Sequence, residues 1–433
     1  MTSPHDEECE MSDSLQLAAC IGLDWADDHH DVSLQEADSS TAERGQVSQT
    51  PEALTEWIAA LRQRFGGRYV GICLETSQGP LVHALLEYEF VVLYPVNPRS
   101  LKRFRETFFP SGAKDDPGDA DLLRELLVKH GERLQRWVPD DAETRALARL
   151  VQARRKAVDL RTQLTQVLRA ELKGYFPQAI AWTGNDLTTR LTTDFLLKWP
   201  TLETVQRAQP QTVRNFYYAH NCRRGDLIEQ RMKEIRSAVP LTTDPAIVDT
   251  STLTVQMLAR QIQALGSSIL RFEKEIAKRF QRHPDAELFR SLPGIGATFA
   301  PRLLTAFGSK RERFDSAVQL QQYTGIAPIT ERSGKTCHTS WRWGAPRFVR
   351  QSFHEYAGLS MLRCAWAKAY YQQQRERGKG HHAALRALAF KWQRVMYQCW
   401  KQRTPYSDAR YVQALRQRNS PLAARLSPEP EAA

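Results

Sequence analysis

Four carboxylates stand where they could share a metal site. Asp24 and Glu75 each end a short apolar segment that predicts a buried strand, and Asp116 and Asp119 lie three residues apart at the start of a helical segment. Open α/β sheets bind ligands at the carboxyl ends of their strands, and residues three apart share a helix face. Carboxylate oxygens suit hard cations, and two such cations stabilise both the attacking and the leaving oxygen of a phosphodiester. The pattern therefore predicts phosphodiester chemistry.

Each acid also has an ordinary structural explanation. Asp116 precedes Pro117 and would make a good helix N-cap, with Asp119 at the position of a capping-box acid. An acid at the end of a strand is often a turn former. The combination of all four acids with the order of the strands favours the metal site.

A second candidate is Ser333, a hydroxyl between two cations. Arg332 precedes it, and Gly334 and Lys335 follow it. A serine nucleophile that attacks a phosphate needs positive charge nearby, which Arg332 and Lys335 could supply. An exposed Ser-Gly turn explains the same residues, and local sequence alone favours that explanation.

Two further stretches are candidates for nucleic-acid binding. The turn Leu292–Gly296 resembles a helix-hairpin-helix turn, in which glycines, here Gly294 and Gly296, let backbone N–H groups approach a phosphate. A later stretch alternates basic and aromatic residues, as on surfaces that bind single-stranded or distorted nucleic acid. Its residues are Trp341, Arg342, Trp343, Arg347, Phe348 and Arg350. An ordinary Gly-Pro loop and a set of core aromatics are the alternatives.

Charge is distributed unevenly along the 433 residues. Residues 1–140 carry 25 Asp and Glu against 13 Lys and Arg, whereas residues 341–420 carry 16 Lys and Arg against 3 acids. A basic block of this kind indicates a polyanionic partner, nucleic acid first of all. The acidic module fits a nucleic-acid binder if some of its carboxylates hold metal, and a solvated acidic surface is the alternative.

Several classes of protein are disfavoured. Seven scattered cysteines without a CxxC pair argue against a disulfide framework and a zinc site. The longest apolar run, Phe90–Val96, is too short for a membrane helix, and the acidic N-terminus does not resemble a signal peptide. We expect a cytoplasmic protein with no membrane partner.

The elements that would position the acids form an α/β layer with a mixed sheet. Three strands joined by short turns precede strands joined by helices, which predicts antiparallel pairing first and parallel pairing later. The expected strands are Leu17–Asp24, His30–Ala37, Glu43–Gln49, Tyr69–Glu75 and Phe90–Val96. The expected helices are Pro51–Phe65, Gly79–Glu89, Arg99–Thr107 and Asp116–His130.

The rest of the chain is predicted to be helical. Val255–Ile276 keeps an apolar heptad pattern, which indicates a coiled coil that could pair within one chain or across a dimer. Helices are also expected over Phe314–Tyr323, Pro346–Gly378 and Gly380–Gln402, with a turn-rich segment at Ile326–Lys335. The predicted divisions are a disordered N-terminus (1–14), an acid-bearing domain (15–138), a coiled-coil region (139–286) with an inserted lobe (176–245), a C-terminal domain (287–405) and a tail (406–433).

Taken together, the chain resembles the DEDD insertion-sequence transposases of the one-ten family from about Leu17 to Arg403. The residues that carry the resemblance are Ile21–Asp24, Leu74-Glu75, Lys114–Ala120, Pro293–Gly296, Tyr323–Gly325 and Ser333-Gly334. Their order and spacing match the family more strongly than any one motif does.

The resemblance implies a composite site. The four acids Asp24, Glu75, Asp116 and Asp119 would hold Mg²⁺, two ions per site, in a ribonuclease-H-like, RuvC-like domain. Ser333 in a C-terminal transposase domain would be the nucleophile and form a transient phosphoserine link to DNA. Donor and target DNA, a guide (bridge) RNA and a homo-dimer or tetramer would be the partners. The site could be assembled within one chain or between subunits.

Two departures from the family pattern matter. Many members carry a lysine three residues after the first acid, where this chain has Asp27. Asp115 precedes Asp116, so a set built on Asp115 and Asp119 is also open, although the distance to Ala120 favours Asp116.

Two other functions use subsets of the same residues. A RuvC-like nuclease that hydrolyses junction DNA would need the acids but not Ser333. A non-catalytic nucleic-acid-binding scaffold would need only the basic helices. A covalent protein–DNA adduct distinguishes the transposase from both.

Overall fold

A computed structural model describes residues 16–75, 79–108, 116–334, 336–340, 342 and 344–426, without the side chains of Phe108, Asp116 and Pro117. By its backbone contacts the chain divides into two compact units. The first comprises residues 1–140 and 328–346, and the second comprises residues 141–327 and 347–433. The finer domain boundaries given by the sequence stay predictions.

The first unit is built on a five-stranded mixed sheet. Its strands are β1 (Ala19–Asp24), β2 (His29–Glu36), β3 (Ala42–Ser48), β4 (Val70–Leu74) and β5 (Val91–Pro95), in the order β3-β2-β1-β4-β5. The pairs β1–β2 and β2–β3 are antiparallel, and β1–β4 and β4–β5 are parallel. This confirms the mixed sheet predicted from the sequence.

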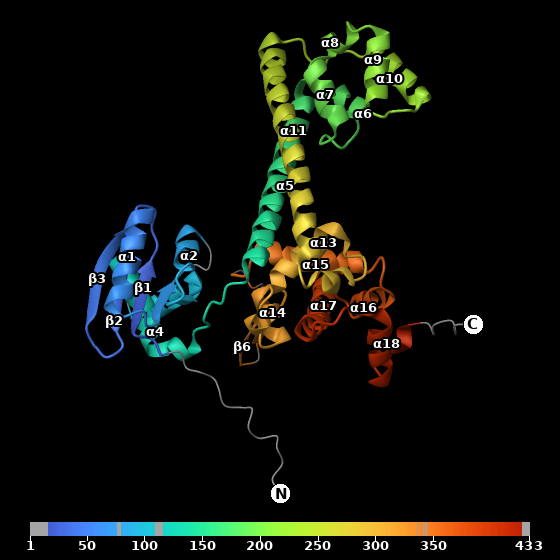
Figure 1. Ribbon diagram of the computed structural model, residues 1–433. Helices are drawn as coiled ribbons and strands as arrows, with labels where there is room; N and C mark the ends of the chain where they lie inside the picture. The colour runs from blue at the N-terminus through green and yellow to red at the C-terminus, as the bar shows by residue number, and fades with distance from the viewer. Residues whose placement is uncertain are drawn as a thin grey trace. The chain divides into compact units, whose positions relative to one another are not determined.

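Helices cover both faces of this sheet. Successive residues of a strand point to opposite faces of the sheet, so the side chains of the central strands form two sets, one on each face. Ile21 and Ile72 pack with α1 (Pro51–Arg64) and α2 (Pro80–Leu85). Cys73 of β4 packs on the other face with α3 (Pro98–Phe108) and α4 (Asp116–His130). The blue and teal part of Figure 1 shows α1 and α4 beside the sheet.

A hairpin completes the first unit. Strands β6 (Ile329–Ser333) and β7 (Thr336–Ser340) pair antiparallel. Gly334, in the tight turn between them, has a left-handed φ of +55°, which a side chain would disfavour. The sequence predicts only a turn-rich segment here, because most of β6 is polar and its pairing with β7 decides its structure.

Two long helices form the stem of the second unit, α5 (Ala142–Tyr175) and α11 (Pro245–Arg282). Each begins at a capping aspartate, Asp141 and Asp244. They run antiparallel, since Thr144 near the start of α5 hydrogen-bonds His283 just past the end of α11. Figure 1 shows the two helices side by side. Supercoiling of the pair stays a prediction.

Each end of the stem has its own core. At one end α5 and α11 pack with a small helical lobe, the predicted insertion, through residues such as Leu172 and Val255. The lobe contains α6 (Gln178–Thr183), α7 (Arg190–Lys198), α8 (Leu202–Gln206), α9 (Pro210–Ala219) and α10 (Gly225–Ser237). At the other end Val151 and Ile276 join the core of the C-terminal helices.

The C-terminal helices surround a cluster of aromatic side chains in which the rings of Trp366 and Trp392 lie 4.5 Å apart. They are α12 (Ala286–Arg290), α13 (Gly296–Phe307), α14 (Ala317–Tyr323), α15 (Arg347–Ser360), α16 (Ala365–Glu376), α17 (His381–Gln402) and α18 (Asp408–Gln417). This confirms the mainly helical C-terminal part. Throughout the described residues, no helix combines the length and apolarity that crossing a membrane requires.

Candidate active site

Asp24 and Glu75 are neighbours at one edge of the sheet. Leu23 of β1 pairs with Leu74 of β4 in a parallel register. The next residue is Asp24, the last residue of β1, in one case and Glu75, just past the end of β4, in the other. The two carboxylates therefore lie at the carboxyl ends of adjacent strands, where the prediction placed them. Both side chains are partly exposed. Residues two apart on a strand point to the same face of the sheet. Asp24 therefore points to the same face as Gly22, and Glu75 to the same face as Cys73, which is the face that α4 covers.

Gly22 sets the distance between this face and helix α4. A Cβ at Gly22 would lie 1.8 Å from the carbonyl oxygen of Ala120 and 2.4 Å from the amide nitrogen of Arg124. No side chain fits between two backbones at that separation. The glycine therefore brings the start of α4, which carries Asp119, against the strand that carries Asp24.

We predict that Gly22→Ala destabilises the protein by about 3 kcal/mol, because the methyl group forces α4 away from β1. Thermal or denaturant unfolding measures the loss. Gly45→Ala is the matched control, since a Cβ on that exposed strand glycine would meet a Val32 methyl group at an ordinary 3.6 Å. Equal stability of the two variants would contradict the close approach.

Asp119 is buried, with 3% of its surface exposed, and forms an ion pair with Arg105 of α3. A buried carboxylate needs such a partner, because desolvation of an unpaired charge costs several kcal/mol. The sequence motifs do not include Arg105. The sequence feature that could have indicated Arg105 as a partner of the acids is its place in a basic helix directly before the Asp116–Asp119 motif.

Asp121 is a third acid on α4, which the sequence motifs do not include, and it holds the helix against the sheet. It accepts a 2.6 Å hydrogen bond from Ser33 Oγ of β2 and forms an ion pair with Arg44 of β3. Arg124 lies 3.9 Å away from the same carboxylate. Asp121 therefore has a structural role and is not part of the carboxylate set.

The donor chemistry of the acids fits a hard cation such as Mg²⁺, because every candidate ligand atom is a carboxylate oxygen. Within the described residues, however, no three His, Cys, Asp or Glu side chains are gathered closely enough to hold a metal ion. The Asp116 side chain lies outside the described residues, and Arg105 supplies the positive charge beside Asp119. Asp115 also lies outside them.

Ser333 ends β6 and is exposed, opposite Thr336 across the hairpin. For the part of the chain that the structure describes, no side-chain hydrogen bond of Ser333 to a general base is found. Its neighbour Arg332 is exposed too, whereas Lys335 falls outside the described residues. The hairpin thus presents the hydroxyl on an accessible turn beside one described cation.

The segment that carries Ser333 belongs to the same compact unit as the acids. Just past the hairpin, a Cβ on Gly344 would come within 2.9 Å of Asn97 Nδ2. Asn97 precedes α3, and its side-chain oxygen accepts a 2.9 Å hydrogen bond from the Arg99 amide. The chain after β7 therefore approaches the start of the helix that carries Arg105.

The residues proposed to bind nucleic acid fall into two groups. Arg332 and Arg342 lie in the first unit, and Gly294, Gly296, Arg347 and Arg350 lie in the second. Gly294, in the turn between α12 and α13, and Gly296, the first residue of α13, have left-handed φ values of +70° and +59°. Arg347 opens α15 and is exposed, whereas Arg342 and Arg350 are half-buried. Their contact with nucleic acid stays a prediction.

Known proteins match the chain along most of its length. A family model described as "Transposase" matches residues 21–177, and one described as "Transposase IS116/IS110/IS902 family" matches residues 286–372. The first match contains Asp24, Glu75 and Asp119, and the second contains Ser333.

Curated relatives agree with these matches. The mini-circle putative transposase for IS117 of Streptomyces coelicolor is 27% identical over 401 residues, covering 91% of this chain and 96% of the relative. The insertion element IS110 43.6 kDa protein of the same organism is 24% identical over 388 residues, covering 88% and 93%. The putative transposase y4uE of Sinorhizobium fredii is 30% identical over 211 residues, covering 47% and 57%. The chain belongs to the IS110 family of DEDD transposases.

Proposed function

We propose that this transposase cuts and rejoins DNA with its carboxylates and a serine nucleophile. Asp24, Glu75, Asp116 and Asp119 hold divalent metal, Mg²⁺ in two copies, and Ser333 attacks the scissile phosphate. The observation that carries the proposal is the register of β1 and β4, which sets Asp24 and Glu75 side by side, with Asp119 brought to the same strand by Gly22.

Bound metal would stabilise the charge that develops on the attacking and leaving oxygens. Ser333 Oγ forms a bond to phosphorus while the bond to the leaving strand end breaks, and the leaving oxygen takes the proton. The resulting phosphoserine ester keeps the energy of the phosphodiester. A hydroxyl at the end of a second strand then attacks phosphorus and releases the serine.

The partners proposed are donor and target DNA, a guide RNA and further copies of the chain. The basic block in residues 341–420 supports a nucleic-acid partner. Assembly into a dimer or tetramer is proposed on the family resemblance.

Dependence on divalent metal tests the catalytic part of this proposal. Purified protein incubated with guide RNA and labelled donor and target DNA should give strand-transfer products with Mg²⁺ and none with a chelator. Restoring Mg²⁺ should restore the products. Products that persist under chelation would exclude a metal role for the acids. The absence of cleavage in every metal tested would favour the binding scaffold.

A further inference from the structure

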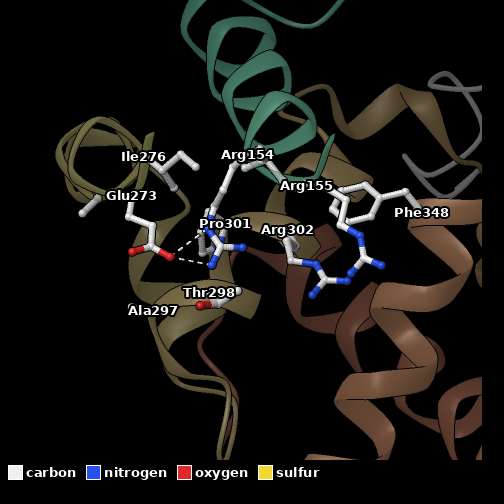
Figure 2. Close-up of a pocket in the computed structure, with 11 residues that line it drawn as sticks. Arg154, Arg155, Glu273, Ile276, Ala297, Thr298, Pro301, Arg302 and Phe348 are labelled. Carbon is white, nitrogen blue, oxygen red and sulfur yellow. Dashed lines mark hydrogen bonds and ion pairs between the residues drawn. The ribbon is translucent and has the colours of Figure 1, made fainter. Parts of the chain in front are cut away.

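A cavity of about 200 Å³ lies inside the second unit, where α5, α11, α13 and α15 meet (Figure 2). Its charged lining residues are Arg154, Arg155 and Arg302 against the single acid Glu273. Its remaining walls are mostly apolar. A pocket of this size with a net positive lining is suited to one small anion.

Two of the arginines are held against one aromatic ring. The guanidinium carbons of Arg155 and Arg302 lie 6.0 Å and 4.8 Å from the centre of the Phe348 ring. Figure 2 shows the three side chains beside one another. Arg302 is only 7% exposed. Burial lowers the pKa of its guanidinium, the charge and the hydrogen bond of Glu355 raise it, and the charges of Arg155 and Arg154 lower it by smaller amounts. An anion between the guanidinium groups would relieve their mutual repulsion.

The present partners of these arginines leave room for an anion. Arg302 donates from Nε to Ser352 Oγ at 3.0 Å, and its Nη2 forms an ion pair with Glu355 at 3.0 Å. Arg154 and Arg155 pair with Glu273 and Asp159, which are 41% and 51% exposed. Ion pairs with such exposed partners contribute little stability, so an anion could replace them at low cost.

The first turn of α13 provides a further attraction for an anion. The helix begins at Gly296, and no side chain among the described residues caps its N-terminus. Ala297 and Thr298, the next two residues, line the cavity. Free N–H groups and the helix dipole favour negative charge at such a position.

We propose that this cavity binds one backbone phosphate of the DNA, held by Arg155, Arg302 and the first turn of α13. The site lies outside the acids and Ser333, and it rests on the proposed function for the identity of its ligand. It would fix DNA at the junction of the stem and the C-terminal helices, beside the turn that contains Gly294.

A charge placed in the cavity tests this assignment. In the full-length protein we compare Ala297→Glu with the near-isosteric Ala297→Gln. An acid in the first turn suits a helix N-terminus, so both variants should melt like the wild type. Fluorescence anisotropy of labelled DNA, measured without divalent cation over a salt series, should show an affinity loss of about tenfold for Ala297→Glu alone. Its log–log salt slope should be shallower by about one phosphate contact.

Arg155→Gln provides the second comparison, with Arg149→Gln as its control. Arg149 is exposed on the same helix and does not line the cavity. DNA affinity should fall for Arg155→Gln and stay near the wild-type value for Arg149→Gln. Equal losses would show a general effect of charge and overturn the proposal.

Calorimetry with inorganic phosphate separates the two sources of the anion. If Ala297→Glu abolishes phosphate binding but leaves DNA affinity unchanged, the cavity binds a free anion and the proposal is wrong. The anisotropy assay requires no cleavage, so its outcome is independent of the roles of Ser333 and the acids. Loss of strand transfer with intact cavity-dependent binding would contradict the proposed catalysis alone.

Discussion

Ser333→Ala is expected to abolish strand transfer and any covalent DNA adduct, with a loss of at least about a thousandfold. In the proposed mechanism Ser333 is the nucleophile, so its loss removes the covalent route, and water in its place cannot conserve the energy of the phosphodiester. The residue is exposed at the end of β6, so stability should change by no more than about 0.5 kcal/mol. RNA binding and oligomeric state should stay as they are.

Labelled DNA on a denaturing gel, with Mg²⁺ and guide RNA present, measures this result. Ser340→Ala at the end of β7 is the control from the same hairpin and should keep its activity. An adduct that persists in Ser333→Ala and disappears in Ser340→Ala would move the nucleophile to Ser340. Hydrolysis that continues in Ser333→Ala, with no adduct in the wild type, would favour the nuclease.

Asp24→Asn and Glu75→Gln should each reduce DNA cleavage at least about a hundredfold, because in the proposed mechanism metal held by the acids stabilises the transition state by several kcal/mol. The amides keep the size of the acid side chains and can still accept a hydrogen bond. Both variants should therefore stay within about 1 kcal/mol of the wild-type stability. A cleavage assay and a melting curve on the same preparations separate loss of chemistry from loss of fold.

Asp119→Asn should reduce cleavage as well, but it should also destabilise the protein by about 3 kcal/mol. The substitution leaves Arg105, whose side chain is 18% exposed, without its charged partner. The double variant Asp119→Asn, Arg105→Gln should recover part of that stability without recovering activity. Unchanged stability of Asp119→Asn would contradict the ion pair.

Much of the first unit could be predicted from local sequence. β1 and β4 are apolar runs that end at acids, and their observed ends lie within two residues of the prediction. Helix α2 is shorter than predicted and stops at Leu85. Glu87 and Glu89 would place negative charge at a helix C-terminus, and the Val91 amide instead bonds the Tyr88 carbonyl as the chain enters β5.

In the C-terminal helices, local sequence does not predict every helix boundary. The predicted helix Pro346–Gly378 is broken between α15 and α16 without Gly or Pro at the break, while packing places Trp366 of α16 against Trp392. By contrast, α14 begins at Ala317 rather than at Phe314. Ser316 caps it by accepting from the Gln319 amide, a signal that the sequence contained.

In the candidate site too, some positions follow from local sequence and others depend on tertiary contacts. The positions of Asp24 and Glu75 follow from strand ends, which a sequence can reveal. The pairing of Asp119 with Arg105 and the close approach of α4 at Gly22 depend on contacts between distant segments. Ser333 could be singled out only through the family resemblance, because its exposed turn has no local feature that distinguishes a nucleophile.

The most direct test of the account is the chemical identity of the protein–DNA link. Wild-type protein is incubated with guide RNA, Mg²⁺ and a target DNA that traps the covalent intermediate, and the digested complex is analysed by mass spectrometry. The account predicts a peptide that carries a nucleotide phosphate on the side-chain oxygen of Ser333. A nucleotide on any other residue, or fully cleaved DNA with no modified peptide, would contradict it.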